Sequence, residues 1–104
     1  MVIRLLVAAA VAVLGLPAAV STAHADATDD QFLAALRSAG IHDASVEHVI
    51  DAGHFVCVRL DNGSTVAEVE SDVMKSSNMP EYHSGFFVGA SINAYCPRHR
   101  AELG

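Results

Sequence analysis

Two histidines and a carboxylate recur at a spacing of three residues in the middle of the chain. His48, Asp51 and His54 fall in a segment with helical periodicity, so each would neighbour the next, and the outer two would lie about 120° apart around the helix axis. Neutral imidazole and carboxylate can hold zinc or another divalent ion. The zinc motif H-E-x-x-H places its histidines four apart, which aligns them better. A solvated polar face is therefore the favoured interpretation, and a metal site is the alternative.

Cys57 and Cys96 are the only cysteines, and they predict one disulfide. Neither has a C-x-x-C partner, which argues against a metal-thiolate pair, and a single catalytic cysteine would leave the other unexplained. A bond that closes a separation of 39 residues would stabilise the domain by roughly 4 kcal/mol. Disulfides persist in oxidising compartments, so this prediction depends on whether the protein is exported.

The first 25 residues have the pattern of a secretory signal peptide. Arg4 precedes an apolar run from Leu5 to Leu16, and residues 23–25 have the A-x-A form of a cleavage site. The apolar stretch, interrupted by Pro17, is shorter than the roughly 20 residues of a transmembrane helix. We therefore predict a cleaved signal peptide over residues 1–25, and a product without a membrane span that is secreted to the extracellular space or the cell envelope.

The exported part would be strongly acidic. It has five basic side chains against twelve acidic ones, a formal charge of −7 with histidine neutral. Binding to nucleic acid or to anionic membranes needs clustered lysine and arginine, so neither is expected as a partner. A protein partner is compatible with this surface, but the sequence identifies neither that partner nor the oligomeric state.

The polar residues do not form a recognisable catalytic set. No serine lies in the nucleophile motif G-x-S-x-G, and the acidic residues do not single out a pair of carboxylates. A substrate cleft would also take up much of the core of a domain of about 79 residues. We therefore predict that the protein is not an enzyme and needs no cofactor.

Aromatic residues in the exported part suggest a second kind of binding site. They could line a cavity for a lipid or for haem, with His83 as an axial ligand. Aromatic residues at helical spacing more often belong to the core, and of two adjacent ones on a helix one should be partly exposed. The residues concerned are Phe55, Tyr82, Phe86, Phe87 and Tyr95.

Helices are predicted to position these residues. The first should span about 29–39, because Thr28 and Gln31 have capping-box spacing and Gly40 suits a Schellman ending. The second should span about 45–61, with a strand over 54–60 as the alternative because its residues favour extended chain. Gly63 should end this second helix, with a hairpin turn at residues 62–63 as the alternative.

Two further helices are predicted in the C-terminal half. Thr65 and Glu68 form a second capping-box pattern, a loop is expected over 76–79, and Pro80 should lie in the first turn of a helix that reaches Cys96. Glycines at 85 and 89 should let this last helix pack closely in the core. The basic residues 98–100 should lie near its negative end.

Three sequence elements together resemble a known family. They are Asp30-Gln31-Phe32-Leu33-Ala34-Ala35-Leu36 with Gly40-Ile41, then Gly53 with Val56-Cys57, Leu60 and Gly63, and finally Ala94-Tyr95-Cys96-Pro97. In this pattern, which covers essentially all of residues 26–104, the chain resembles the small exported mycobacterial proteins of domain-of-unknown-function family 732. The resemblance implies a small helical, secreted domain with a single disulfide and no assigned activity.

The sequence therefore predicts an all-α fold, a small bundle of about four short helices closed by a Cys57–Cys96 disulfide, in one domain of residues 26–104. The predicted function is a non-enzymatic interaction module of the cell envelope or extracellular space. The alternative is a carrier of a small ligand, such as a lipid or haem, or of a divalent metal.

Overall fold

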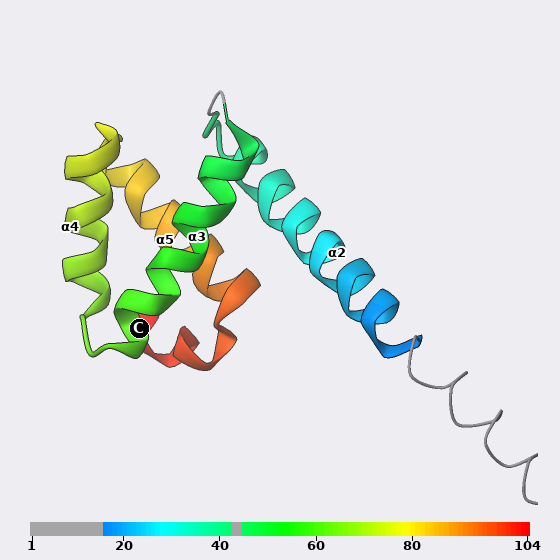
Figure 1. Ribbon diagram of the computed structural model, residues 1–104. Helices are drawn as coiled ribbons and strands as arrows, with labels where there is room; N and C mark the ends of the chain where they lie inside the picture. The colour runs from blue at the N-terminus through cyan, green and yellow to red at the C-terminus, as the bar shows by residue number, and fades with distance from the viewer. Residues whose placement is uncertain (1–15, 43–44) are drawn as a thin grey trace, which may run out of the picture.

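The structure, a computed structural model, describes residues 16–42 and 45–104; most of the predicted signal peptide, residues 1–15, lies outside this part. Its elements are α2 (Leu16–Ser38), α3 (Val46–Asp61), α4 (Val66–Ser77), α5 (Glu81–Tyr95) and the 3-10 helix η1 (Pro97–Leu103). Helix α5 packs against each of the other four (Figure 1). No strand occurs in the described ranges. The predicted all-α fold of about four helices closed by one disulfide is confirmed.

Helix α2 begins much earlier than predicted. It starts at Leu16 instead of about Asp29 and ends at Ser38, close to the predicted end. The residues before Asp29 are rich in alanine, the strongest helix former, and Pro17 is tolerated because it lies in the first turn. Thr28 is therefore interior to the helix, and its predicted position at the helix start is wrong for this chain. Figure 1 shows the N-terminal half of α2 projecting away from the other helices.

Glycines with positive φ follow α2 and α3. Gly40 has a φ of +81°, and the N–H of Ile41 donates to the carbonyl of Leu36 at 2.9 Å, which is the predicted Schellman motif. Gly63, with a φ of +97°, follows α3 with the same pattern of bonds. Helix α3 is continuous up to this point, so the alternatives of a strand over 54–60 and a hairpin at 62–63 are wrong.

Side-chain caps begin α3 and α4. The hydroxyl of Ser45 accepts the N–H of His48 at 3.2 Å, which caps α3. At the start of α4 the hydroxyl of Thr65 accepts the N–H of Glu68 at 3.1 Å. The Glu68 carboxylate accepts the N–H of Thr65 at 2.9 Å in return. The capping box predicted at Thr65 and Glu68 is confirmed.

The predicted loop over 76–79 is too long. Helix α4 continues to Ser77 and ends at Asn78, which has a φ of +58°. Asparagine reaches this left-handed conformation more readily than other residues with a side chain, and so replaces glycine as the helix end. Pro80 lies immediately before α5, at its N-cap, rather than in its first turn as predicted. Helix α5 ends at Tyr95, directly before Cys96.

The core forms around α5. Val88, Ile92 and Cys96 are completely enclosed, and α2 contributes Phe32 and Leu36 to the same cluster. Among the helices that the structure describes, none is long and apolar enough to cross a membrane. The remaining buried apolar side chains come from the loop after α2 and from α3, α4 and α5: Ile41, Val49, Val56, Cys57, Leu60, Val69 and Phe87.

Helix α3 approaches α2 and α5 most closely at Gly53. A β-carbon at this position would lie 2.8 Å from Cζ of Phe32 and 3.1 Å from Cε2 of Tyr95. These aromatic atoms occupy the space that any larger residue would need. The glycine that the sequence shows in the middle of a helix therefore has a packing reason.

Replacing Gly53 by alanine is expected to lower the free energy of unfolding by about 1–3 kcal/mol, because the added methyl group overpacks the core. Gly89→Ala in α5 is a matched control, since a β-carbon at Gly89 would meet open space. That substitution should stabilise the protein by about 0.5–1 kcal/mol. Urea unfolding of both variants measures the difference, and similar effects at the two positions would contradict this account of Gly53.

Candidate binding groove

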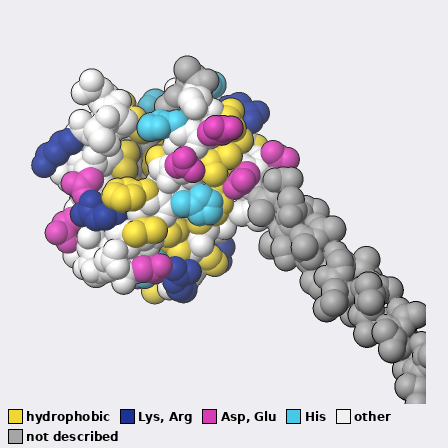
Figure 2. All heavy atoms as spheres, viewed as in Figure 1, with side chains coloured by type: hydrophobic (Ala, Val, Ile, Leu, Met, Phe, Trp, Pro, Cys, Tyr) yellow, Lys and Arg dark blue, Asp and Glu magenta, His cyan; other side chains and the backbone are white. Residues whose placement is uncertain are grey.

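An apolar groove of about 420 Å³ runs between α3 and α4. Its walls include side chains of both helices, and Phe87 of α5 closes its floor. Figure 2 shows hydrophobic side chains at the surface along the seam between α4 and α3. Pockets of this size are typical of small-molecule sites. The apolar side chains that line its centre are Val49, Ala52, Val56, Val69 and Val73.

Phe55 and an ion pair stand at one end of this groove. The Phe55 side chain lines the groove and is 56% exposed, although its ring is large and apolar. The guanidinium of Arg59 lies 6.0 Å from the centre of the Phe55 ring and forms an ion pair with Asp72 of α4. Its Nε also donates to the hydroxyl of Ser64 at 3.3 Å. Arg59 is thus held in place by groups from both sides of the groove, and its charge is neutralised there.

His48 lines the groove toward the opposite end. The α3 residues along the groove run from His48 to Arg59, a distance of about 16 Å at 1.5 Å per residue. Ser76 and Ser77 also line the groove, and they follow Asp72 toward the end of α4, away from the turn that joins α3 to α4. Their hydroxyls donate to the carbonyl of Val73. The part of the groove away from that turn therefore has exposed polar side chains and no lysine, arginine or carboxylate in its lining.

The predicted metal-ligating residues do not converge. His48, Asp51 and His54 are all exposed, but His48 faces the groove whereas the ring of His54 lies 3.9 Å from that of Tyr95. Tyr95 belongs to α5, on the side where α2 packs, so the two imidazoles lie on different sides of α3. No set of three or more possible metal ligands occurs among residues 16–42 and 45–104. The spacing of three residues therefore places these side chains on different sides of α3 and does not bring them together.

The aromatic residues proposed as a cavity lining are also dispersed. Phe87 is 3% exposed and belongs to the core, whereas Phe86 is 39% exposed, as expected for adjacent residues. Tyr82 is largely exposed, with its ring 5.4 Å from that of His83. His83 does not line the α3–α4 groove. Of the five aromatic residues, this groove includes only Phe55 and Phe87.

Tyr95 belongs to an aromatic cluster that fixes α2 against α5. Its ring packs edge-on against Phe32, with 5.1 Å between the ring centres, and Phe32 meets Phe87 in the same way at 5.8 Å. The hydroxyl of Tyr95 donates to the Asp29 carboxylate at 2.6 Å. Burial, together with this bond to Asp29, raises the pKa of Tyr95. The aromatic residue is a structural link to α2 and not a ligand contact.

A second groove, of about 460 Å³, lies between α2 and α5. Gly85 and Gly89 line it together with Ala35 of α2 and the exposed Phe86. The close packing predicted for the two glycines does not occur at Gly89, where a β-carbon would meet nothing within 4 Å, whereas at Gly85 a β-carbon would lie 3.4 Å from the Glu70 carboxylate. Its lining combines these small residues with the rings of Phe32 and Phe86.

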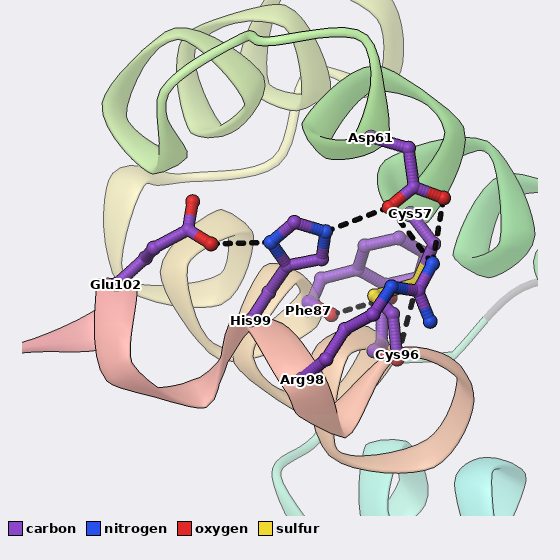
Figure 3. The surroundings of a disulfide bond; sticks show 8 residues. Cys57, Asp61, Phe87, Cys96, Arg98, His99 and Glu102 are labelled. Atoms are coloured by element: carbon purple, nitrogen blue, oxygen red, sulfur yellow. Dashed lines mark hydrogen bonds and ion pairs between the residues drawn. A yellow bond between two sulfur atoms is a disulfide. The ribbon is translucent and has the colours of Figure 1, made fainter.

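The chain turns back after α5 toward the end of α3, beside the disulfide (Figure 3). The sulfur atoms of Cys57 and Cys96 lie 2.05 Å apart. Arg98 in η1 donates to both carboxylate oxygens of Asp61, at 2.6 and 2.8 Å. The ring nitrogen Nε2 of His99 lies 2.7 Å from the same carboxylate. The disulfide and the polar cluster thus join the same two segments, the end of α3 and the chain that follows α5.

The basic residues 98–100 were predicted to complement the negative end of α5. Arg100 donates to the Asn93 side chain of that helix at 2.8 Å, but the other two pair with Asp61 at the end of α3. Asp61 lies where the negative end of the α3 dipole disfavours a carboxylate, so it needs positive partners. Arg100 therefore lies at α5 as predicted, whereas Arg98 and His99 complement the negative end of α3.

The pKa values in this cluster shift in opposite directions. Hydrogen bonds from Arg98 and His99 lower the pKa of Asp61 from its ordinary 3.8, so its contribution to stability is present above pH 3.8 and is lost as the pH falls through the lower folded value. Hydrogen bonds to Asp61 and Glu102 raise the pKa of His99 from 6.5. Its contribution is complete below pH 6.5 and is lost as the pH rises through the raised value.

The cluster should therefore stabilise the fold most between about pH 4 and about pH 6.5. Urea unfolding of the parent and of Asp61→Asn from about pH 3 to about pH 9 measures this contribution as a difference in the free energy of unfolding. The difference should be largest inside that window and should decrease on both sides. Asp51→Asn, at an exposed aspartate outside the cluster on the same helix, is the control. A difference for Asp61→Asn that does not vary with pH would contradict the assignment.

The sequence patterns did not identify the α3–α4 groove. Its central residues Ala52 and Val73 are small and apolar, and each is individually typical of a helix that faces a core. One signal was available: α3 has Phe55 and Val58 in addition to a complete buried face, so its apolar residues exceed what the core needs. The Arg59–Asp72 pair joins two helices, and no local spacing indicates it.

Known proteins similar to this chain have no assigned function. A family model described as "Protein of unknown function (DUF732)" matches residues 28–98. Uncharacterized protein Rv1271c of Mycobacterium tuberculosis is 30% identical over 93 residues, which cover 88% of this chain and 82% of that protein. Uncharacterized protein Mb1323c of Mycobacterium bovis is 35% identical over 78 residues, which cover 75% of this chain and 70% of that protein. No solved structure gives a significant match.

Proposed function

The chain belongs to the DUF732 family of proteins of unknown function, and from its fold and surface we propose that it is an exported, non-enzymatic binding module. The observation that carries this proposal is the α3–α4 groove with Phe55 exposed at its edge. In the free protein the exposed Phe55 ring lacks the favourable free energy of burial. A partner bound in the adjacent groove would cover the ring and supply that free energy. Binding through this groove, and not catalysis, is therefore the proposed activity.

Export to the extracellular space or the cell envelope is the second part of the proposal. The A-x-A pattern at residues 23–25 supports it, as does the disulfide distance between Cys57 and Cys96. Cleavage after Ala25 would remove the part of α2 that projects from the bundle and keep Phe32 and Leu36, which pack in the core. The domain of residues 26–104 would thus keep its core.

Intact-mass spectrometry of the protein released by an expressing cell tests export. We expect the mass of residues 26–104 less two hydrogen atoms, in the medium or the cell envelope. Measured under native conditions, the same sample reveals any copurifying ligand as additional mass. Intracellular, uncleaved protein with two free thiols would refute the export proposal.

Cleavage should also change the role of Thr28. In the uncleaved chain this residue is interior to α2, whereas a helix that starts after Ala25 would present Thr28 and Gln31 as a capping box. Thr28→Ala should therefore destabilise the cleaved protein by about 1 kcal/mol more than the uncleaved chain. Thermal unfolding of both forms measures this, with Thr28→Ser as the control that retains a capping hydroxyl. Equal effects in both forms would count against a new helix start.

A carrier of a small ligand is the second candidate, and the form of the groove favours it. The groove is bounded by three helices and has the volume of a small-molecule site. The metal and haem versions of this hypothesis lack such support, because His48 and His54 lie on different sides of α3 and His83 does not line this groove. An apolar ligand without a metal is the version that the geometry supports.

Binding of the uncharged fluorescent probe N-phenyl-1-naphthylamine tests whether the groove accepts an apolar group. Its fluorescence should rise on binding to the parent and should fall sharply in Ala52→Trp, which fills the groove. Ala67→Trp is the matched control, because Ala67 lies on α4 outside the groove and is exposed. If the parent does not bind the probe, or if both variants bind it equally, the groove is not the binding site.

A further inference from the structure

We propose that the α3–α4 groove holds one alkyl or acyl chain with an uncharged polar head group, its head at the His48 end. This inference rests on the proposed binding role of the groove and specifies the ligand. It depends on three observations: the width of the groove, the neutralisation of Arg59, and a polar lining without lysine, arginine or carboxylate at the other end.

The dimensions of the groove select a single extended chain. A volume of about 420 Å³ over a length of about 16 Å corresponds to a mean width of roughly 6 Å. A peptide helix is about 10 Å across, so it could place only side chains in this groove. A methylene takes up about the liquid volume of one water molecule, about 30 Å³. The groove therefore has room for roughly 14 methylene groups, the size of one chain.

The charges at the Arg59 end of the groove disfavour an anionic head group there. Arg59 is the cation that lines it, and Asp72 neutralises that charge across the groove. A carboxylate ligand would have to displace Asp72 or remain unpaired near it, which is unfavourable in a partly dry site. The chain as a whole is also acidic, with a formal net charge of −6, which repels anions further.

The opposite end suits an uncharged head group with hydroxyls. His48, Ser76 and Ser77 have exposed side chains there. Both serine hydroxyls donate to the carbonyl of Val73, and that of Ser77 also accepts the N–H of Met79, so the His48 ring and the Ser76 oxygen are the atoms that a ligand could use. A glycerol or similar polyol head could bond to them and remain in contact with water. The apolar chain would then extend over Val56 and Phe87 toward Phe55, whose exposed ring it would cover. This placement uses both ends of the groove and its apolar centre.

Displacement of N-phenyl-1-naphthylamine by three twelve-carbon ligands tests the inference on the protein as the cell releases it. The ligands are 1-monolauroylglycerol, laurate and dodecyltrimethylammonium, each below its micelle concentration. We expect 1-monolauroylglycerol to bind at least tenfold more tightly than laurate and more tightly than the cation. Shortening the neutral ligand by two methylenes should weaken binding about fifteenfold, since each buried methylene contributes about fourfold.

Variants assign this binding to the groove and its charges. Phe55→Ala should weaken binding of 1-monolauroylglycerol severalfold. Val58→Ala should not, because Val58 is a similarly exposed α3 residue outside the groove. Asp72→Asn leaves the charge of Arg59 unpaired, so laurate binding should tighten about tenfold and the preference for the neutral ligand should nearly disappear. Both Phe55 and Asp72 are exposed enough to be replaced without opening the core.

The outcomes distinguish this inference from the proposal on which it rests. If the groove binds the probe but none of the three ligands displaces it, the groove is a binding site for something else and the acyl-chain inference is wrong. Tighter binding of laurate or of the cation than of the neutral ligand overturns the head-group assignment. Failure of the parent to bind the probe refutes the binding groove itself.

Discussion

Replacing Cys57 and Cys96 together by alanine is expected to lower the free energy of unfolding by about 4 kcal/mol. The bond closes a separation of 39 residues and so restricts the unfolded chain. A domain of about 79 residues has a total stability of roughly 4–12 kcal/mol, so this loss removes a large part of it. Urea unfolding at 25 °C measures the change. Alanine is chosen over serine because both cysteines are buried, and a hydroxyl there would need a partner.

Reduction of the parent protein provides the control. A thiol reductant should reproduce most of the loss in the parent and should have no effect on the double variant. The cluster around Asp61 would still hold η1 to the end of α3, but its exposed ion pairs are individually weak and cannot replace the covalent link. A double variant as stable as the parent would mean that helix packing alone maintains the fold.

Much of the fold was accessible from local sequence signals. Ser45, Thr65 and Gly63 act within one helical turn of their own position, so the backbone groups that they satisfy are fixed by spacing along the chain. The cysteine pair was predictable because no other cysteine competes. These features do not depend on how the helices are arranged, and the structure reproduces them.

The start of α2 was not predictable in the same way. Thr28 and Gln31 have the right spacing for a helix start, but the alanine-rich residues before them continue the helix. A capping pattern marks a helix start only when the preceding residues do not favour helix. If residues 1–25 are removed as proposed, the same residues would instead begin the helix.

Side-chain contacts between helices were the least predictable part of the site. His48 and His54 share one helix, yet one faces α4 and the other stacks on Tyr95 of α5. The residue that lies opposite each histidine depends on the angle and the distance between the helices. The periodicity of a single segment gives neither of these quantities. The pairing of Arg59 with Asp72 and of Asp61 with Arg98 is of the same kind. The groove became visible only once α3, α4 and α5 were placed together.

Phe32→Ala should have the largest effect of any single apolar substitution in α2, a loss of about 3–5 kcal/mol in the free energy of unfolding. Phe32 is 1% exposed and packs edge-on against the rings of Phe87 and Tyr95. Its removal leaves a cavity between α2, α3 and α5 that the surrounding helices can fill only in part. Phe55→Ala is the matched control, because the same truncation at a side chain that is 56% exposed should cost less than about 1 kcal/mol.

Phe32 also lies against Gly53, so the effect of Phe32→Ala can be tested through this one contact and not only through the burial of Phe32. Gly53→Ala should be costly in the parent, where the new methyl group would meet the Phe32 ring at 2.8 Å. In the Phe32→Ala background the ring is gone and the methyl group occupies part of the cavity, so only the contact with Tyr95 still opposes it. The four proteins of this double-mutant cycle should give a coupling energy of about 1–3 kcal/mol. Additive losses would mean that Gly53 is required for another reason, and that α2 does not depend on this close approach to α3.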